Sequence, residues 1–274
     1  MSIDTRTHES LRKQRRPFAL FDAHLHIVDP RYPLVANNGF VPAPFTVHDY
    51  LQRMAQYDLA GGAVVSGSFQ AFDQSYLLAA LEQLGNRFVG VTQLRADVSD
   101  RTLLDLDAAG VRAVRFNLRR GGSEDARHVE RVAHRVHALV GWHVELYVDA
   151  AELAALEATL VALPAVSIDH LGLSAAGLPT LIRLVERGVR VKATGFGRVD
   201  FAVADALRRI DAIDPGALMF GTDLPSTRAP RPYDNRDFDL VADTLGADAA
   251  RRVLYDNARD FYRPRNASRP GETP

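Results

Sequence analysis

The segment LFDAHLHIVD, residues 20–29, begins as an apolar run typical of a β-strand and then places two histidines two residues apart. Side chains of a strand point to the same face at every second residue, so His24 and His26 are expected to face one side. An imidazole can bind a metal, act as a general base or donate a hydrogen bond. Because the pattern is short, two half-buried histidines that satisfy backbone groups are the alternative.

The composition of the chain limits the classes of protein to which it can belong. With 274 residues, of which 47% are hydrophobic, it can bury the core of one large α/β domain or of two small ones. The formal net charge of -1 gives no global field that favours nucleic acid or an anionic membrane. No apolar stretch approaches the roughly 20 residues that span a bilayer, and no cysteine is present for disulfides or thiolate metal sites. We therefore expect a cytoplasmic protein that binds neither nucleic acid nor membrane, and the sequence predicts no particular oligomeric state.

The chain alternates short strand-like runs with helical runs. After the first strand, runs typical of strands occur at residues 61–66, 87–93, 111–117, 142–148, 166–170, 189–192 and 218–223. Eight strand–helix units in about 250 residues predict an α/β fold with a parallel sheet closed as a single (β/α)8 TIM barrel. An open doubly wound sheet fits less well, and no Gly-rich dinucleotide motif follows the first strand.

We expect three parts in the chain: a basic N-terminal arm at residues 1–17, the barrel domain at 18–263 and a polar C-terminal tail at 264–274. The charges of the arm are interpreted as solvated, with a contact to another subunit as the alternative. The connection after the first strand, residues 27–45, is long and contains Tyr32 and Phe40. A loop of this length is typical of a functional lid or a disordered segment, and its aromatic content favours an ordered lid.

Functional groups of such barrels lie at the C-terminal ends of the strands. These ends carry His24 and His26 on the first strand, His170 on the sixth and Asp223 on the eighth, which we predict to be the catalytic residues. The fourth, fifth and seventh strands add Arg115, Asn117, Glu145, Tyr147, Lys192 and Arg198. The remaining histidines are interpreted as structural or solvent-facing, because they fall in the arm, on helices or, for His143, at the start of a strand.

Three motifs resemble signatures of the amidohydrolase superfamily: FDAHLH at 21–26, IDHLG at 168–172 and FGTDLP at 220–225. They are similar to its branch of small TIM-barrel hydrolases, which includes 2-pyrone-4,6-dicarboxylate hydrolase and sugar lactonases, over nearly the whole chain. The resemblance implies that Asp223 is the general base of an active site that also contains His24, His26 and His170. It also implies substrate-binding roles for Arg115, Tyr147 and Arg198, to which we add Asn117 on the strand of Arg115.

The chain departs from the metal-dependent members of that superfamily at two strand ends. Their fifth strand presents a histidine, where this chain has Glu145 and Tyr147. Binuclear members have a bridging lysine on the fourth strand, where this chain reads RFN at 115–117. These differences favour an enzyme that requires no cofactor. The alternative is one divalent metal such as Zn²⁺, which would be held by His24, His26 and Asp223.

Two further departures concern the substrate. The pyrone hydrolase has an arginine where this chain has Leu173 and an asparagine where it has Ser226. A dicarboxylate pyrone is therefore disfavoured, whereas the hydrolytic residues are retained. Arg119 and Arg120 follow the fourth strand and fit a binding role as well as they fit solvated charges.

The residues favour hydrolysis of a small, anionic lactone similar to a pyrone or a sugar-acid lactone. A carboxylate beside imidazoles can activate water, and arginines pair with carboxylates. Histidine, arginine and tyrosine side chains would polarise the carbonyl group. The alternatives are a metal-dependent decarboxylase of the same superfamily and a barrel that binds a ligand without turnover.

Overall fold

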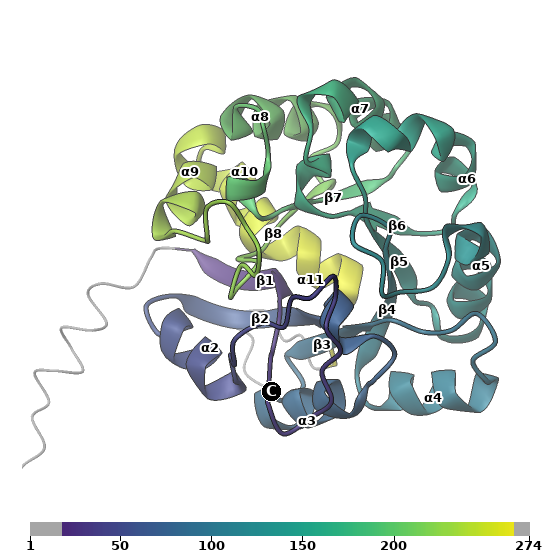
Figure 1. Ribbon diagram of the computed structural model, residues 1–274. Coiled ribbons are helices and arrows are strands. Elements are labelled where there is room, and N and C mark those ends of the chain that lie inside the picture. The colour runs from purple at the N-terminus through teal and green to yellow at the C-terminus, as the bar shows by residue number, and fades with distance from the viewer. Residues whose placement is uncertain (1–17, 266–274) are drawn as a thin grey trace, which may run out of the picture.

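The computed structural model describes residues 18–265, so the predicted arm at residues 1–17 and most of the predicted tail lie outside the described residues. Eight parallel strands follow one another around a ring in chain order (Figure 1). They are β1 (Ala19–Leu25), β2 (Asp58–Val65), β3 (Phe88–Thr92), β4 (Val111–Asn117), β5 (His143–Tyr147), β6 (Val166–Ile168), β7 (Arg190–Ala193) and β8 (Leu218–Phe220). The prediction of a single (β/α)8 barrel is confirmed.

Helices surround the strands, and their apolar faces pack on the outside of the barrel (Figure 1). They are α2 (Val47–Met54), α3 (Ser75–Leu84), α4 (Asp100–Ala108), α5 (Val129–Val140), α6 (Glu157–Ala162), α7 (Leu178–Glu186), α8 (Val203–Ile213), α9 (Asn235–Leu245), α10 (Ala247–Arg251) and α11 (Asn257–Tyr262). In α5, for example, Val129, Val132, Ala133 and Val136 are buried, which is the spacing of one helix face. No helix within the described part of the chain is both long and apolar enough to cross a membrane.

Local sequence signals explain where helices begin and end. Thr46 caps α2, because its side chain accepts from the backbone N–H of Asp49 while the Asp49 carboxylate accepts from the N–H of Thr46. The helix α5 ends at Gly141, whose φ of 70° lies in the left-handed region that glycine adopts without strain. Between β5 and β6, Asp149 caps a 3₁₀ turn at Ala150–Ala155, and α6 begins only after this turn.

The interior of the barrel is apolar on one side and charged on the other. Strands β1 to β3 and β8 contribute small or apolar side chains: Phe21, Ala23, Ala63, Val65, Val89, Val91 and Met219. Strands β4, β5 and β7 contribute Arg115, Glu145 and Lys192, all buried. The helix α11 closes the lower end, where Tyr262 stacks on Phe21 and donates a hydrogen bond to Glu145. At this end, opposite the C-terminal ends of the strands, the charged interior therefore has no access to solvent.

The end of β1 is irregular, and this turns His24 toward the interior of the barrel. The register with β2 shifts between Asp22 and Leu25. Ala23 packs in the interior cluster, and the next residue, His24, also faces the interior, where it contacts Lys192. A β-bulge re-aims side chains in this way.

The barrel closes through the same segment. The backbone N–H of Asp223 donates to the carbonyl of His24, and that of His26 donates to the carbonyl of Leu224, each at 2.7 Å. The buried Asp22 carboxylate reinforces the junction by accepting from the backbone and hydroxyl of Thr222 at 2.8 and 2.7 Å. Closure of the barrel therefore places Asp223 beside the two histidines.

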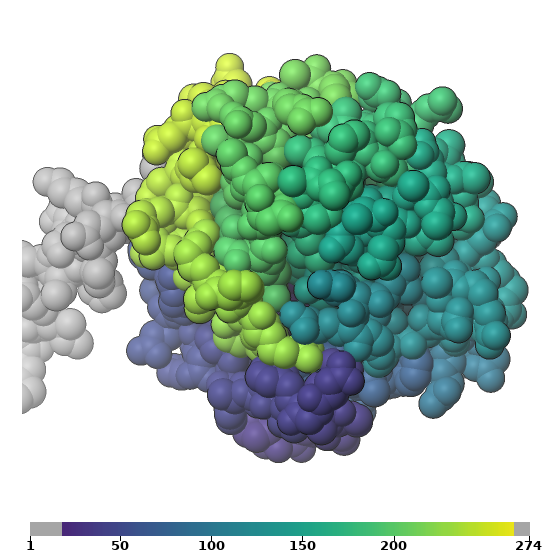
Figure 2. Space-filling model, turned by 45° about the horizontal axis from the view of Figure 1, so that its top comes forward, coloured from purple at the N-terminus to yellow at the C-terminus, as the bar shows by residue number. Residues whose placement is uncertain are grey.

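The predicted lid, residues 27–45, forms hydrogen bonds and a cation–π contact with two other loops. Arg228, which follows β8, donates to the side chain of Asn37 at 2.9 Å and lies 4.7 Å from the centre of the Phe40 ring. Asn37 in turn donates to the carbonyl of Arg120 at 3.1 Å. In Figure 2 the dark purple lid segment lies against the yellow-green segment after β8. The lid, the β4 loop and the β8 loop therefore meet through Asn37.

Replacement of Asp22 tests the closure of the barrel. Asp22→Ala leaves buried N–H and O–H groups of Thr222 and Tyr50 without their acceptor. We expect the free energy of unfolding to fall by about 2–4 kcal/mol, as measured by urea denaturation. Asp97→Ala, at an exposed aspartate, should change it by less than about 0.5 kcal/mol. An equally small effect of Asp22→Ala would show that closure does not depend on this carboxylate.

Candidate active site

A cavity whose empty space of about 300 Å³ is partly open to solvent lies at the C-terminal ends of the strands. It is lined by seven of the eight residues predicted from the sequence: His26, Arg115, Asn117, Tyr147, His170, Arg198 and Asp223. The eighth, His24, is wholly buried and does not line the cavity. His24 contacts His26, which lines the cavity, and the two Nε2 atoms are 3.3 Å apart.

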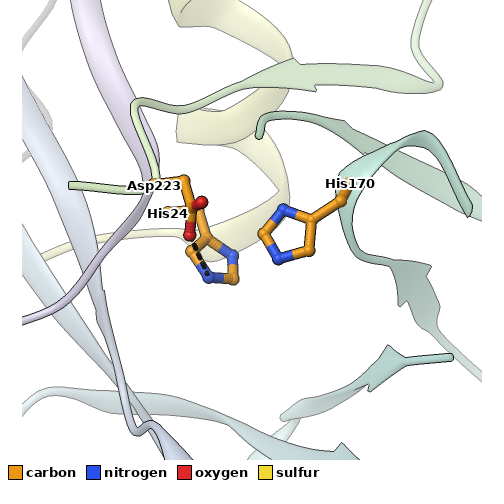
Figure 3. A group of neighbouring side chains, drawn as sticks. All are labelled: His24, His170 and Asp223. Carbon is orange, nitrogen blue, oxygen red and sulfur yellow. Dashed lines mark ion pairs between the residues drawn. The ribbon is translucent and has the colours of Figure 1, made fainter. Parts of the chain in front are cut away.

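Asp223 lines this cavity, and its two carboxylate oxygens have different surroundings. Its Oδ2 accepts from Nε of Arg198 at 2.7 Å, whereas its Oδ1 is buried and has no hydrogen-bond partner among the described residues. Oδ1 lies 3.6 Å from Nε2 of His26 and 3.9 Å from Nε2 of His24. Figure 3 shows Asp223, His24 and His170 converging. A buried carboxylate oxygen without a partner is an acceptor available to a ligand.

Two opposing effects set the charge of Asp223. Burial raises its pKa, but the guanidinium of Arg198, together with the neighbouring imidazoles, outweighs burial and holds the pKa well below its usual range. Asp223 is therefore ionised at neutral pH, but it is a weak base.

His170 approaches the cavity from the segment after β6. Its Nδ1 is 2.6 Å from the hydroxyl of Thr194, and its ring centre is 5.0 Å from that of Tyr147. Burial lowers the pKa of His170 to about 3, so the ring is neutral. The strands expected to reach His170 and Asp223 end earlier, at Ile168 and Phe220, because both site residues adopt left-handed backbone conformations with φ of 53° and 57°. Strained backbone of this kind is frequent at functional sites.

Glu145 and Lys192, expected at strand ends facing the mouth, lie lower in the interior and do not line the cavity. Lys192 donates to Glu145, which also accepts from Tyr262 and lies 3.1 Å from Nε2 of His143. Burial raises the pKa of Glu145, but Lys192 and His143 outweigh it and lower the pKa to about 2. Glu145 is thus fully engaged in the interior, and the interpretation of His143 as structural agrees with its contacts.

The arginines of the cavity differ in their partners. Arg115 donates to Asp169 from Nε and from a terminal nitrogen, at 3.0 and 2.8 Å, and Arg198 is paired with Asp223. Arg120 and Arg228 line the cavity and have no carboxylate partner among the described residues, whereas Arg119 is exposed and does not line it. The two alternatives left open for the residues after β4 therefore divide: Arg120 faces the cavity and Arg119 faces solvent.

The family model described as Amidohydrolase matches residues 21–263. The chain belongs to this family. It is 28% identical over 175 residues to a 2-pyrone-4,6-dicarboxylate hydrolase of Comamonas testosteroni, an alignment that covers 62% of this chain and 57% of the relative. It is 25% identical to a 4-sulfomuconolactone hydrolase of Hydrogenophaga intermedia, over 90% of this chain and 89% of the relative.

The fold also matches solved structures. A protein of Pseudomonas putida that is provisionally named a 2-pyrone-4,6-dicarboxylic acid hydrolase superposes with a TM-score of 0.72 at 26% identity, over 89% of this chain and 97% of that protein. The whole described barrel is therefore the amidohydrolase barrel, and the cavity at its mouth is the position at which TIM-barrel enzymes have their active sites.

Amidohydrolases can hold divalent metals, and the donor atoms of this member are close enough for one. Nε2 of His24, Nε2 of His26 and Oδ1 of Asp223 are separated by 3.3, 3.6 and 3.9 Å, near the spacing of zinc ligands with bonds of about 2 Å. Charges of both signs surround these atoms. Lys192 and Asp169 each lie 3.4 Å from Nδ1 of His24, and Arg198 pairs with Asp223. The site therefore combines ligand spacing with two protein cations beside the donor atoms.

Sequence reasoning missed several residues of the site. Asp169 was recognised only as the neighbour of His170, although it pairs with Arg115 and lies 3.4 Å from His24. Thr194 directly follows β7, and Arg228 lies five residues past Asp223; both are in loops without periodicity. For Asp169 the signal was present, because an aspartate at the end of a buried strand requires a cationic partner.

Proposed function

We propose that this amidohydrolase is a metal-independent lactonase that opens a small cyclic ester carrying an anionic group. The observation that carries the proposal is Oδ1 of Asp223, a cavity-lining residue: this oxygen has no hydrogen-bond partner among the described residues and lies 3.9 and 3.6 Å from Nε2 of His24 and His26. The similarity to relatives that are named as hydrolases of a pyrone dicarboxylate and of a sulfomuconolactone supports it.

In the proposed reaction, Asp223 Oδ1 accepts a proton from water as the water oxygen bonds to the lactone carbonyl carbon. The carbonyl oxygen becomes an oxyanion, which the side chains of His170 and Tyr147 are positioned to stabilise from the cavity wall. The ring C–O bond then breaks, and the proton held by Asp223 passes to the ring oxygen. One water is consumed, and a hydroxy acid is formed.

The weak basicity of Asp223 restricts the substrate. A carboxylate whose pKa is held down by Arg198 removes a proton from water only with difficulty, so the carbonyl must itself be reactive. Lactones with electron-withdrawing substituents meet this requirement, because their alkoxide or enolate leaving group needs little protonation. Amides do not, since an amine leaving group must be protonated.

The anionic group of the substrate is assigned to Arg120 and Arg228. Burial lowers the pKa of Arg228, and the nearby charge of Arg120 lowers it further, so the two guanidinium groups repel each other across the cavity rim. A carboxylate or sulfonate between them would relieve the repulsion and accept hydrogen bonds from both.

A cytoplasmic location and the lack of a nucleic-acid or membrane partner stay predictions from composition.

Asp223→Asn tests the general base. The variant keeps the size of the side chain but cannot accept a proton at neutral pH, so kcat on the best lactone should fall by about 100-fold or more, with KM little changed. Steady-state kinetics on a panel of lactones measures this, and Asp97→Asn serves as the exposed control. A loss of less than about tenfold would assign activation of water to another group.

Arg120→Met tests the anion site, and Arg119→Met is a matched control from the same loop. KM for an anionic lactone should rise about 10- to 100-fold in Arg120→Met, because a charge-assisted pair is lost, while KM for a neutral lactone of the same ring stays the same. Arg119→Met should alter neither value, since that side chain is outside the cavity. Equal effects of the two variants would contradict the assignment.

Removal of metal separates the proposed lactonase from a metal-dependent decarboxylase. Prolonged dialysis against a chelator should leave lactone turnover nearly unchanged, and added Zn²⁺ or Mn²⁺ should not raise it, because Arg198 and Lys192 already occupy the charge positions around the donor atoms. Activity that is lost to the chelator and restored by a stoichiometric amount of metal would make His24, His26 and Asp223 ligands instead.

A further inference from the structure

Lys192 is unusual because lysine is rare in this chain. Of 33 basic side chains, Lys13 and Lys192 are the only lysines, and Lys13 lies outside the described residues. Lys192 is completely buried in the barrel beneath the cavity. An ammonium group is a compact donor on a flexible stem, whereas the planar guanidinium of arginine is larger and rigid. The interior therefore uses a point donor at this position.

Lys192 begins a line of hydrogen bonds whose direction can be read from its two ends. Its Nζ lies 3.4 Å from Nδ1 of His24, as does Oδ1 of Asp169, and an ammonium can only donate, so Nδ1 accepts in the contact with Lys192. At the other end, Nδ1 of His26 lies 2.7 Å from the carbonyl oxygen of Val65, which can only accept, so that Nδ1 carries a proton. The two Nε2 atoms face each other at 3.3 Å. A neutral His26 must accept there, so His24 donates from Nε2.

We propose that Lys192 is the positioning residue that holds His24 in its Nε2–H form and thereby keeps a divalent metal out of this site. The direction read from Lys192 and the direction read from Val65 agree, although they start from unrelated groups. In this arrangement His24 has no lone pair on Nε2, and the lone pair of His26 Nε2 is occupied. Neither histidine can then act as a ligand through the atom that faces Asp223.

A metal would require the opposite proton position on His24. Nδ1 would carry the proton and would face the ammonium of Lys192, donor against donor, at 3.4 Å. The carboxylate that could accept that proton is present, because Oδ1 of Asp169 is also 3.4 Å from Nδ1 of His24 and has no hydrogen-bond partner among the described residues. A histidine ligand that donates to such a carboxylate is the usual arrangement around zinc. Lys192 and Asp169 therefore compete for one nitrogen, and Lys192 favours the metal-free state.

This inference rests on the metal-independent character of the proposed function, but its tests require no turnover. Failure to find a lactone substrate would count against the proposed function and leave the hydrogen-bond line intact. A wrong proton position on His24 would count against Lys192 and leave lactone hydrolysis open.

The first experiment uses the wild-type protein with ¹⁵N-labelled histidine. Nitrogen chemical shifts distinguish a protonated from an unprotonated ring nitrogen, and the spectrum of His24→Gln identifies the signals of His24. We expect opposite neutral tautomers: His24 protonated on Nε2 and His26 protonated on Nδ1. A proton on Nδ1 of His24 in the metal-free wild type would overturn the proposal.

The second experiment measures Zn²⁺ binding by titration calorimetry on chelator-treated protein. Lys192→Met retains the length of the side chain without charge or donor, and zinc affinity should rise about 10- to 100-fold over the wild type, as changes in the partners of metal ligands typically produce. Arg190→Met is the matched control, because Arg190 is a cation on the same strand that pairs with Asp214 away from His24. Its zinc affinity should equal that of the wild type.

A second variant controls for the possibility that Lys192→Met fails to fold. Lys192→Met leaves Glu145 as an unpaired buried charge, so Lys192→Met combined with Glu145→Gln keeps the interior neutral and retains an acceptor for Tyr262. The double variant should bind zinc more tightly than Glu145→Gln alone. Unchanged zinc affinity in the folded variants, or tight zinc binding by the wild type, would contradict the role assigned to Lys192.

Discussion

The ion pair between Lys192 and Glu145 is the constraint on which the interior of this barrel depends. Both side chains are fully buried, and a buried charge is tolerated only when it is paired and its remaining hydrogen-bonding groups are satisfied. Glu145 meets this condition with three donors, and Lys192 meets it with Glu145, Asp169 and His24. The stability of the charged half of the barrel and the hydrogen bonding of the active-site histidines are therefore decided by the same groups.

The two histidines of β1 and the aspartate after β8 are brought together by closure of the sheet, which is why the motifs at 21–26 and 220–225 belong together. Asp22 and Thr222, the polar residues that precede the functional ones, supply the hydrogen bonds of the junction. Each motif thus contains a residue that joins the barrel and a residue that the proposed reaction uses. Damage to the junction would displace Asp223 from His24 and His26 even if no catalytic atom were changed.

The sequence was sufficient for the fold and for the meeting of His24, His26, His170 and Asp223, because the C-terminal ends of parallel strands in a closed barrel face one mouth. It was insufficient for Glu145 and Lys192. Alternation along a strand predicts which face a side chain takes, but the depth at which it lies depends on the stagger between strands, which no local pattern encodes. The contacts of Arg228 with the lid were beyond prediction for a related reason, since they join loops distant in sequence.

Two cations of the protein, Arg198 and Lys192, lie beside the atoms that have metal-ligand spacing. Arg198 holds Asp223 ionised and lowers its basicity, a role that a bound dication would also have. Lys192 supplies positive charge on the far side of His24 and fixes the direction of its hydrogen bond. Protein cations thus occupy the electrostatic place of a metal without its ability to generate hydroxide. The proposed preference for reactive lactones over amides follows from this arrangement, because a weakly basic carboxylate needs a carbonyl that is already reactive.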